Sequence, residues 1–204
     1  IEQRRRSRTE DLTSALLDAE IDGDKLSDQE VLGFLFLMVV AGNETTTKLL
    51  GNAAYWGAHN PDQVAQVLND PERVTYWVEE TLRFDTSSQI VARTTAVDLE
   101  YYGQTVPAGE KMLLLIGSAN RDEDVFEDGD RYRIGRDSTN KLVSFGGGVH
   151  FCLGAHLARL EANIALAEFA KSVRHFEVDE SGIERVHSTN VRGFAALPMK
   201  VQVR

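Results

Sequence analysis

The spacing of apolar residues along the chain changes near residue 85. Before that point apolar positions recur every three or four residues, as in amphipathic helices, and after it they alternate in short runs typical of strands. The first part predicts helices over residues 9–19, 31–59, 61–68 and 72–84. The second part predicts short strands over residues 90–95, 98–102, 104–106 and 111–117.

Local signals mark the ends of several of these elements. Ser27, with Glu30 three residues later, forms a capping box ahead of the long helix. The Asn-Pro pair at residues 60–61 ends that helix and lets Pro61 open the next one. The turn at Tyr102-Gly103-Gln104 predicts a hairpin between two of the strands.

The rest of the chain predicts a mixed region that ends in strands. We expect a polar meander over residues 120–141 and a glycine-rich loop over 144–152. A second long helix should follow from Cys152 to about Phe176, and two or three strands after it. The apolar side of that helix is predicted to hold Leu157, Leu160, Ile164 and Leu166. This order indicates a mainly α (α+β) fold, because helices and strands do not alternate regularly.

Composition narrows the class of protein. The chain has 204 residues and a formal net charge of −10, which argues against a nucleic-acid-binding protein. A single cysteine, Cys152, excludes a disulfide framework. The longest apolar run, residues 34–42, is too short to cross a bilayer, and no signal peptide is recognisable. Because the chain begins with Ile1, we expect it to start inside a longer protein. We also expect a cytoplasmic location.

The strongest chemical signal is the segment FGGGVHFCLG at residues 145–154. Three consecutive glycines allow a tight turn and close approach of the backbone to another group. Cys152 is predicted at the start of a helix, where the free N–H groups favour a thiolate, which is a good metal ligand. Gly154 leaves one side of the sulfur open and Phe145 covers the other. The alternative is a turn followed by a buried structural cysteine. A phosphate-binding loop is disfavoured because no Gly-Lys-Ser/Thr ending is present.

Two further segments are ambiguous when taken alone. Glu80 and Arg83 stand three residues apart on one helix face, where most such pairs are solvated. The segment AGNETTT at residues 41–47 interrupts an apolar helix with a glycine and three threonines, which are poor helix formers. An acid beside a hydroxyl, Glu44 with Thr45, suggests proton delivery. The other interpretation is a local kink with Glu44 on the surface.

Together and in this order, the three segments resemble the cytochrome P-450 superfamily of haem-thiolate monooxygenases, in its bacterial soluble type. The haem loop of that family reads Phe-x-x-Gly-x-His/Arg-x-Cys-x-Gly, and residues 145–154 fill every fixed place. Residues 41–45 are similar to its oxygen-activation helix and residues 80–83 to its Glu-x-x-Arg helix. The resemblance covers the C-terminal half of the fold, with long helices and small antiparallel sheets, and implies that the N-terminal half is absent.

The resemblance implies a role for each matching residue. Cys152 would be the thiolate ligand of the iron in haem b, and Glu44 with Thr45 would relay protons during dioxygen activation. Arg93 and His150 would bind the haem propionates. A structural network would join Glu80, Arg83 and Arg136. The haem loop itself would be formed with Phe145, Gly148 and Gly154.

The resemblance also implies an organic, largely apolar substrate. The residues expected to contact it are Leu37, Met38, Ser88, Gln89, Ile90, Val91, Phe194 and Ala195. Electrons would come from NAD(P)H through a ferredoxin or flavodoxin, with Arg159 helping that partner to dock. Two stretches depart from the family pattern, because residues 84–88 lack the usual proline and residues 120–123 lack the usual Asp-Pro.

Two alternative hypotheses stay open at this point. His150, Cys152 and His156 could chelate zinc, although no fourth ligand is evident. The chain could also be a non-catalytic fragment, since a half-domain exposes a large apolar surface. Such a fragment is expected to self-associate, with a homo-oligomer as one outcome, and to bind haem poorly.

Overall fold

The computed structural model describes residues 1–137 and 141–204, and these form two compact units, residues 1–44 and 45–204. The helices are α1 (Glu2–Arg6), α2 (Leu12–Asp18), α3 (Asp28–His59), α4 (Pro61–Asn69), α5 (Val74–Phe84), α6 (Ile116–Ala119) and α7 (Ala155–Ser172). Single 3-10 turns are η1 (Pro71–Arg73), η2 (Gly148–His150) and η3 (Glu180–Gly182).

The strands are short and pair in antiparallel twos. They are β1 (Glu20–Ile21), β2 (Asp24–Lys25), β3 (Ile90–Thr94), β4 (Leu99–Tyr101), β5 (Gln104–Val106), β6 (Lys111–Leu115), β7 (Val173–Val178), β8 (Glu184–Arg185), β9 (Phe194–Ala196) and β10 (Met199–Val203). The pairs are β1 with β2, β3 with β6, β4 with β5, β7 with β10 and β8 with β9. The mainly α fold with small antiparallel sheets is therefore as predicted.

The first unit, residues 1–44, is built on a small apolar cluster. Leu16 and Leu17 of α2 pack with Val31 of α3. The predicted capping box is present at the start of α3, because the Ser27 N–H donates to Glu30 Oε2 at 2.8 Å and the Glu30 N–H donates back to Ser27 Oγ at 3.3 Å. The helix α3 begins in this unit and continues into the second.

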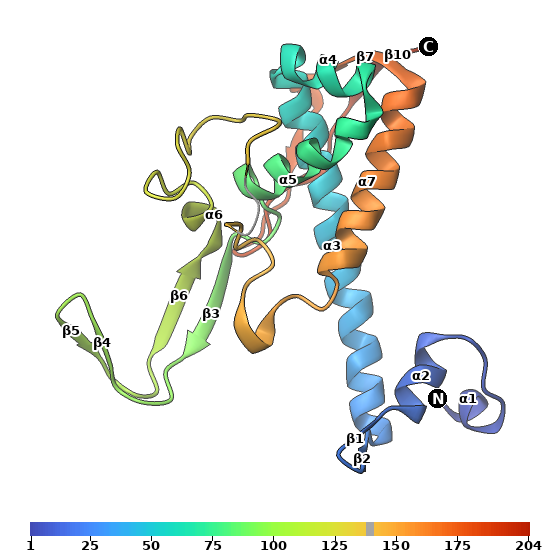
Figure 1. Ribbon diagram of the computed structural model, residues 1–204, viewed down its shortest axis with the longest axis vertical. Coiled ribbons are helices and arrows are strands. Elements are labelled where there is room, and N and C mark those ends of the chain that lie inside the picture. Colours follow the sequence, from blue (N-terminus) through green and yellow to red (C-terminus); the bar gives the residue numbers. More distant parts are fainter. Residues whose placement is uncertain (138–140) are drawn as a thin grey trace. The chain divides into compact units, whose positions relative to one another are not determined.

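The second unit, residues 45–204, holds the main core. Trp77 and Val78 of α5 are fully buried against α7, and Phe176 of β7 packs over them. Figure 1 shows the strands β3 and β6 side by side and the hairpin of β4 and β5 beyond them. That hairpin turns at Tyr102 and Gly103 with φ values of 50° and 75°, as the sequence predicts.

Three element boundaries differ from the prediction, two of them at the C-terminal helix. The helix α7 begins at Ala155, with Gly154 at its N-cap, so Cys152 precedes the helix and does not open it. The helix ends at Ser172, because Val173 already pairs with Val203 in the sheet of β7 and β10. The stretch predicted as strand to residue 117 ends at 115 and turns into the short helix α6.

The buried face of α7 is also different from the predicted one. Small residues pack inward, with Ala155, Ala162 and Ala170 fully buried beside Leu166. Leu157, Leu160 and Ile164 are about half exposed instead. A close approach between α5 and α7 explains the exchange, because alanines let two helices pack tightly. No helix in the described part of the chain is both long and apolar enough to span a membrane.

Candidate active site

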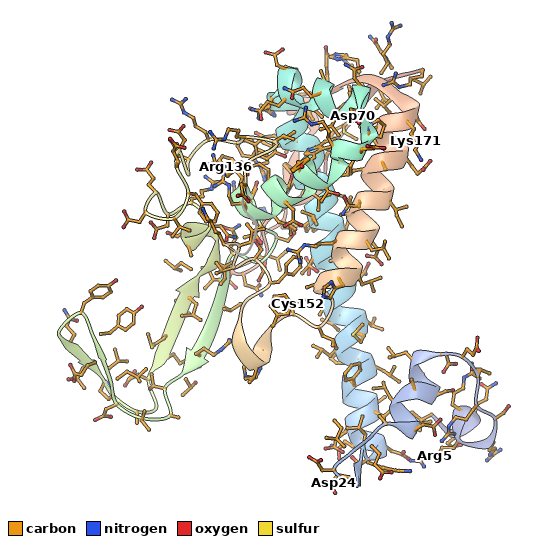
Figure 2. All side chains as sticks on the ribbon, viewed as in Figure 1. Arg5, Asp24, Asp70, Arg136, Cys152 and Lys171 are labelled. Atoms are coloured by element: carbon orange, nitrogen blue, oxygen red, sulfur yellow. The ribbon has the colours of Figure 1, made fainter. Side chains whose placement is uncertain are left out.

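Cys152 lies on a loop that folds back on itself just before α7, and Figure 2 marks its position. Gly146 and Gly148 adopt φ values of 72° and 64°, a region that side chains with a Cβ rarely enter. The Cys152 N–H donates to the carbonyl of Phe145 at 2.9 Å, which closes the loop. The thiol is exposed, so the interpretation as a buried structural cysteine is wrong.

The surroundings of the sulfur leave room for a flat group. A Cβ placed on Gly154 would lie 4.0 Å from Cys152 Sγ, and the positions of Gly147 and Gly148 face open space. Apolar side chains of the same loop are exposed, including Phe151 and Leu153. The sulfur also stands at the N-terminal end of an 18-residue helix, whose dipole favours negative charge.

A buried asparagine that the sequence did not single out holds the start of this loop. Asn120 accepts a hydrogen bond from the Val143 N–H at 3.0 Å and donates to Ser144 Oγ at 2.8 Å. Ser144 Oγ in turn donates to the carbonyl of Leu82 in α5 at 2.7 Å. Asn120 is fully buried, whereas Val143 and Ser144 are half-buried. The only signal in the sequence was its position at the start of the polar meander.

Glu80 and Arg83 form a fully buried ion pair, so the interpretation as a solvated surface pair is wrong. Arg83 Nε and Nη2 donate to the two Glu80 oxygens at 2.9 and 2.7 Å. The other donors go to the carbonyls of Asn120, Gly129 and Arg131 at 2.8–3.0 Å. All five N–H groups of Arg83 are therefore satisfied, which is what burial of a guanidinium requires.

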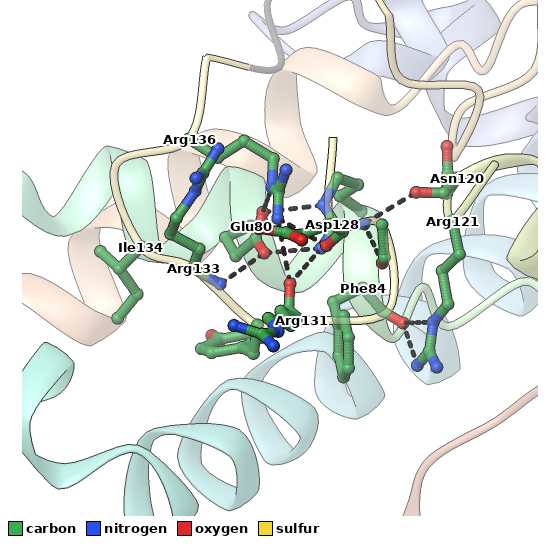
Figure 3. Close-up of polar contacts among 12 residues, drawn as sticks. Glu80, Phe84, Asn120, Arg121, Asp128, Arg131, Arg133, Ile134 and Arg136 are labelled. Atoms are coloured by element: carbon green, nitrogen blue, oxygen red, sulfur yellow. Dashed lines mark hydrogen bonds and ion pairs between the residues drawn. The ribbon is translucent and has the colours of Figure 1, made fainter. Parts of the chain in front are cut away.

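Arg136 is the third member of this network, as Figure 3 shows. Its Nε lies 3.5 Å from Glu80 Oε2, and its other nitrogens reach carbonyls of residues 127, 128 and 131. Burial lowers the pKa of the Arg136 guanidinium, and the Glu80 carboxylate opposes that shift. Glu80 also accepts from the Arg133 N–H at 2.7 Å, so it ties the meander to α5.

The segments predicted to contact substrate come together in part. Ser88 bridges to Val191, and the Gln89 N–H donates to the carbonyl of Asn190 at 2.8 Å. Ser87 Oγ donates to the carbonyl of Thr45 at 2.8 Å. The residues from Ser88 to Val91 are half-buried, Phe194 is buried and Ala195 is exposed. Leu37 and Met38 belong to the first compact unit, residues 1–44.

The predicted proton-relay and propionate residues are accessible. Glu44 and Thr45 are consecutive in α3, the acid exposed and the hydroxyl residue half-buried. Arg93 is an exposed residue of β3, and His150 is exposed in η2. Phe145 is half-buried and packs against the main core.

The zinc alternative is not supported. Among the residues that the structure describes, no three His, Cys, Asp or Glu side chains come close enough to hold one metal ion. His150, Cys152 and His156 are therefore not a chelating set. Arg159, expected to help a redox partner to dock, forms an ion pair with Glu79 and stays partly exposed.

Another set of contacts that was not predicted from the sequence lies at the end of α5. Asp85 is buried and accepts from Trp56 Nε1 at 2.8 Å and from Arg192 Nε at 2.7 Å. The pair joins residues 85–90 to the turn before β9. An aspartate directly after an amphipathic helix is typical of an ordinary helix end, so the burial of Asp85 could not be predicted from the sequence.

A model of the family described as cytochrome P-450 matches residues 1–204. The chain belongs to the cytochrome P-450 family. Cytochrome P-450 123 of Mycobacterium tuberculosis is 64% identical over 200 residues, which cover 98% of this chain and 50% of that protein.

Solved cytochrome P-450 structures also match nearly the whole chain. CYP109Q5 from Chondromyces apiculatus is 40% identical with a TM-score of 0.95, over 100% of this chain and 52% of that one. CYP109E1 from Bacillus megaterium, solved with testosterone, is 35% identical with a TM-score of 0.92, over 97% and 55%. The chain thus spans about half the length of these relatives.

The cytochrome P-450 family implies haem, and the residues around Cys152 fit such a group. The donor set is one accessible thiol, and the described residues contain no cluster that offers further protein ligands. Glycine rather than a side chain stands beside the sulfur at position 154, and exposed apolar side chains flank it. One soft sulfur ligand beside an open apolar face suits a flat macrocycle whose iron Cys152 would bind as a thiolate.

Proposed function

We propose that residues 1–204 are the C-terminal, haem-binding half of a single cytochrome P-450 domain, and that the complete protein is a monooxygenase. It inserts one oxygen atom from dioxygen into an organic substrate, with electrons from NAD(P)H delivered by a ferredoxin or flavodoxin. The observation that supports this most is the accessible Cys152 thiol on a loop that buried contacts tie to Glu80 and Arg83.

In this proposal haem b supplies the iron that activates dioxygen, with electron density donated by the thiolate. Cys152 holds the iron, and the carbonyl of Phe145 holds the Cys152 N–H. Gly148 and Gly154 let the backbone approach the ring closely, since Gly148 faces open space and a Cβ at Gly154 would lie 4.0 Å from the Cys152 sulfur. Arg93 and His150 donate to the propionates, which suits an exposed guanidinium and an exposed imidazole.

Glu44 and Thr45 move protons toward the reaction centre. An exposed carboxylate can take a proton from water and pass it to the neighbouring hydroxyl at Thr45 Oγ1. The backbone of this turn is held by the hydrogen bond from Ser87 Oγ to the carbonyl of Thr45. Ser87 stands in the stretch that departs from the family pattern, and its hydroxyl ties this stretch to α3.

The substrate is largely apolar. The residues proposed to contact it are half-buried Ser88, Gln89, Ile90 and Val91, together with Phe194, Ala195, Leu37 and Met38. Most of these side chains are hydrophobic or small. The testosterone in the structure of the related CYP109E1 supports the same class of substrate, because that molecule is a large apolar ring system.

A carbon monoxide difference spectrum of the complete protein tests the assignment. Reduction by a chemical reductant under carbon monoxide should give the Soret band position of thiolate-ligated haem. Cys152→Ser should abolish that band, because a serine oxygen does not replace the thiolate donor. His156→Ala is the matched control and should keep the band. A Cys152→Ser protein with an unchanged band would overturn the proposal.

A second candidate concerns the 204 residues expressed alone. Exposed apolar residues on α7 and on β6 favour self-association of the chain and loose binding of haem. Size-exclusion chromatography with a haem absorbance trace separates the two cases. A monomer that carries one tightly bound haem would exclude this candidate for the isolated chain.

A further inference from the structure

Arg159 of α7 forms an ion pair with the Glu79 carboxylate of α5. Its Nε lies 2.6 Å from Glu79 Oε1, and its Nη2 lies 3.2 Å from Glu79 Oε2. Both side chains are mostly buried, 31% and 23% exposed. Two parallel N–H···O contacts fix the plane of the guanidinium as well as its position.

The same guanidinium covers the ring of Phe145. Arg159 Cζ lies 4.5 Å from the ring centroid, within the range of a cation–π contact. The carbonyl of Phe145 is the acceptor for the Cys152 N–H at 2.9 Å. Arg159 therefore holds the side chain of the residue whose backbone holds the cysteine.

Glu79 and Glu80 are neighbours in α5, and each is linked to a different part of the loop. Glu80 pairs with Arg83, whose contact with Asn120 leads to Val143 and Ser144. Glu79 reaches the next residue, Phe145, through Arg159. The two carboxylates thus fix consecutive residues of the loop from the same helix.

We infer that Glu79 and Arg159 form a positioning clamp that fixes Phe145 and, through the hydrogen bond from the Cys152 N–H to the Phe145 carbonyl, keeps the cysteine loop in the geometry that binds the iron. The inference rests on the proposed function. If the clamp is lost, Phe145 can shift and the hydrogen bond from the Cys152 N–H to its carbonyl weakens. A thiolate that is held less firmly donates less electron density, so the reduction potential of the iron should rise.

Arg159→Lys in the complete, haem-loaded protein is the sharpest test. Lysine keeps the positive charge but lacks the planar fork that both pairs with Glu79 and lies over a ring. We expect a more positive midpoint potential. We also expect the ferrous carbon monoxide complex to lose its thiolate-type Soret band about fivefold faster, as loss of a cation–π contact predicts.

Thr75→Val is the matched control. Thr75 Oγ1 donates to Asn163 Oδ1 at 2.9 Å, so it joins the same two helices without a contact to Phe145. This variant should keep the wild-type potential and decay rate. An equal effect in both variants would reduce the clamp to ordinary helix docking and overturn the inference.

The outcomes also separate this inference from the proposed function. A wild-type protein without a thiolate-type band would refute the proposed function itself. A wild-type protein with that band, together with an Arg159→Lys variant of unchanged potential and decay rate, would refute only the clamp. If Arg159→Lys takes up no haem, Glu79→Gln serves instead, because it removes one prong of the contact, and the decay should again be faster.

Discussion

Arg83 is buried with all of its N–H donors engaged, and this single residue explains much of the rigidity beneath the cysteine loop. Such a guanidinium tolerates burial only while its carboxylate partner and carbonyl acceptors stay in place. Spacing alone could not reveal this, since an exposed pair such as Glu168 and Lys171 has the same three-residue separation.

These two pairs make a matched comparison. Glu80→Gln leaves Arg83 and Arg136 buried without a counter-charge, and we expect a loss of about 3–5 kcal/mol in the free energy of unfolding. Glu168→Gln breaks a solvent-exposed pair and should cost less than about 0.5 kcal/mol. Denaturant unfolding of the complete protein measures both. If both variants lose the same free energy of unfolding, burial of the Glu80 pair does not add to stability.

At the scale of elements, the sequence predicted what local signals determine. The capping box at Ser27, the Asn-Pro break before α4 and the turn at Tyr102-Gly103 all act within a few residues, and each lies where it was expected. The end of α7 could not be predicted, because pairing of Val173 with a strand far along the chain decides it.

The buried face of α7 was mispredicted for a related reason. Hydrophobicity favours Leu157, Leu160 and Ile164, but close packing of α5 favours the small residues Ala155 and Ala162. The same limit applies to the candidate site. The motif residues could be named from the sequence, whereas Asn120 and the partner of Arg159 depend on which elements meet in space.

Asn120 is the point where α5, the meander and the cysteine loop meet, so its loss should affect more than one element. Asn120→Ala removes the contacts to Val143 and Ser144 and leaves buried polar groups unpaired, which should cost about 2–3 kcal/mol. We also expect faster transfer of haem from the complete protein to a scavenging apoprotein. Asn69→Ala, at an exposed position of α4, should stay within about 0.5 kcal/mol and release haem at the wild-type rate. Wild-type haem release from Asn120→Ala would contradict the anchoring role.

At the scale of the whole molecule, the chain spans about half the length of its relatives. This offers an explanation for the exposed apolar residues. Leu157, Leu160 and Ile164 line one side of α7 at three- and four-residue spacing, and about half of each side chain is exposed. Isolated exposed apolar residues are common, but a stripe of this kind indicates a surface that another element covers. In the proposed domain the N-terminal half would supply that element.

The 204-residue chain studied alone should therefore associate through this stripe. Replacing Leu157, Leu160 and Ile164 together by glutamine should weaken self-association at least about tenfold, because each buried leucine-sized side chain contributes about 1.5–3 kcal/mol. Sedimentation velocity over a concentration series measures the change. Tyr102→Ser, at a hairpin tip that is 96% exposed, removes a comparable apolar surface elsewhere and should leave association unaltered. In the complete protein the triple variant should lower the unfolding midpoint instead. If it alters neither association of the isolated chain nor stability of the complete protein, the stripe is not an interface.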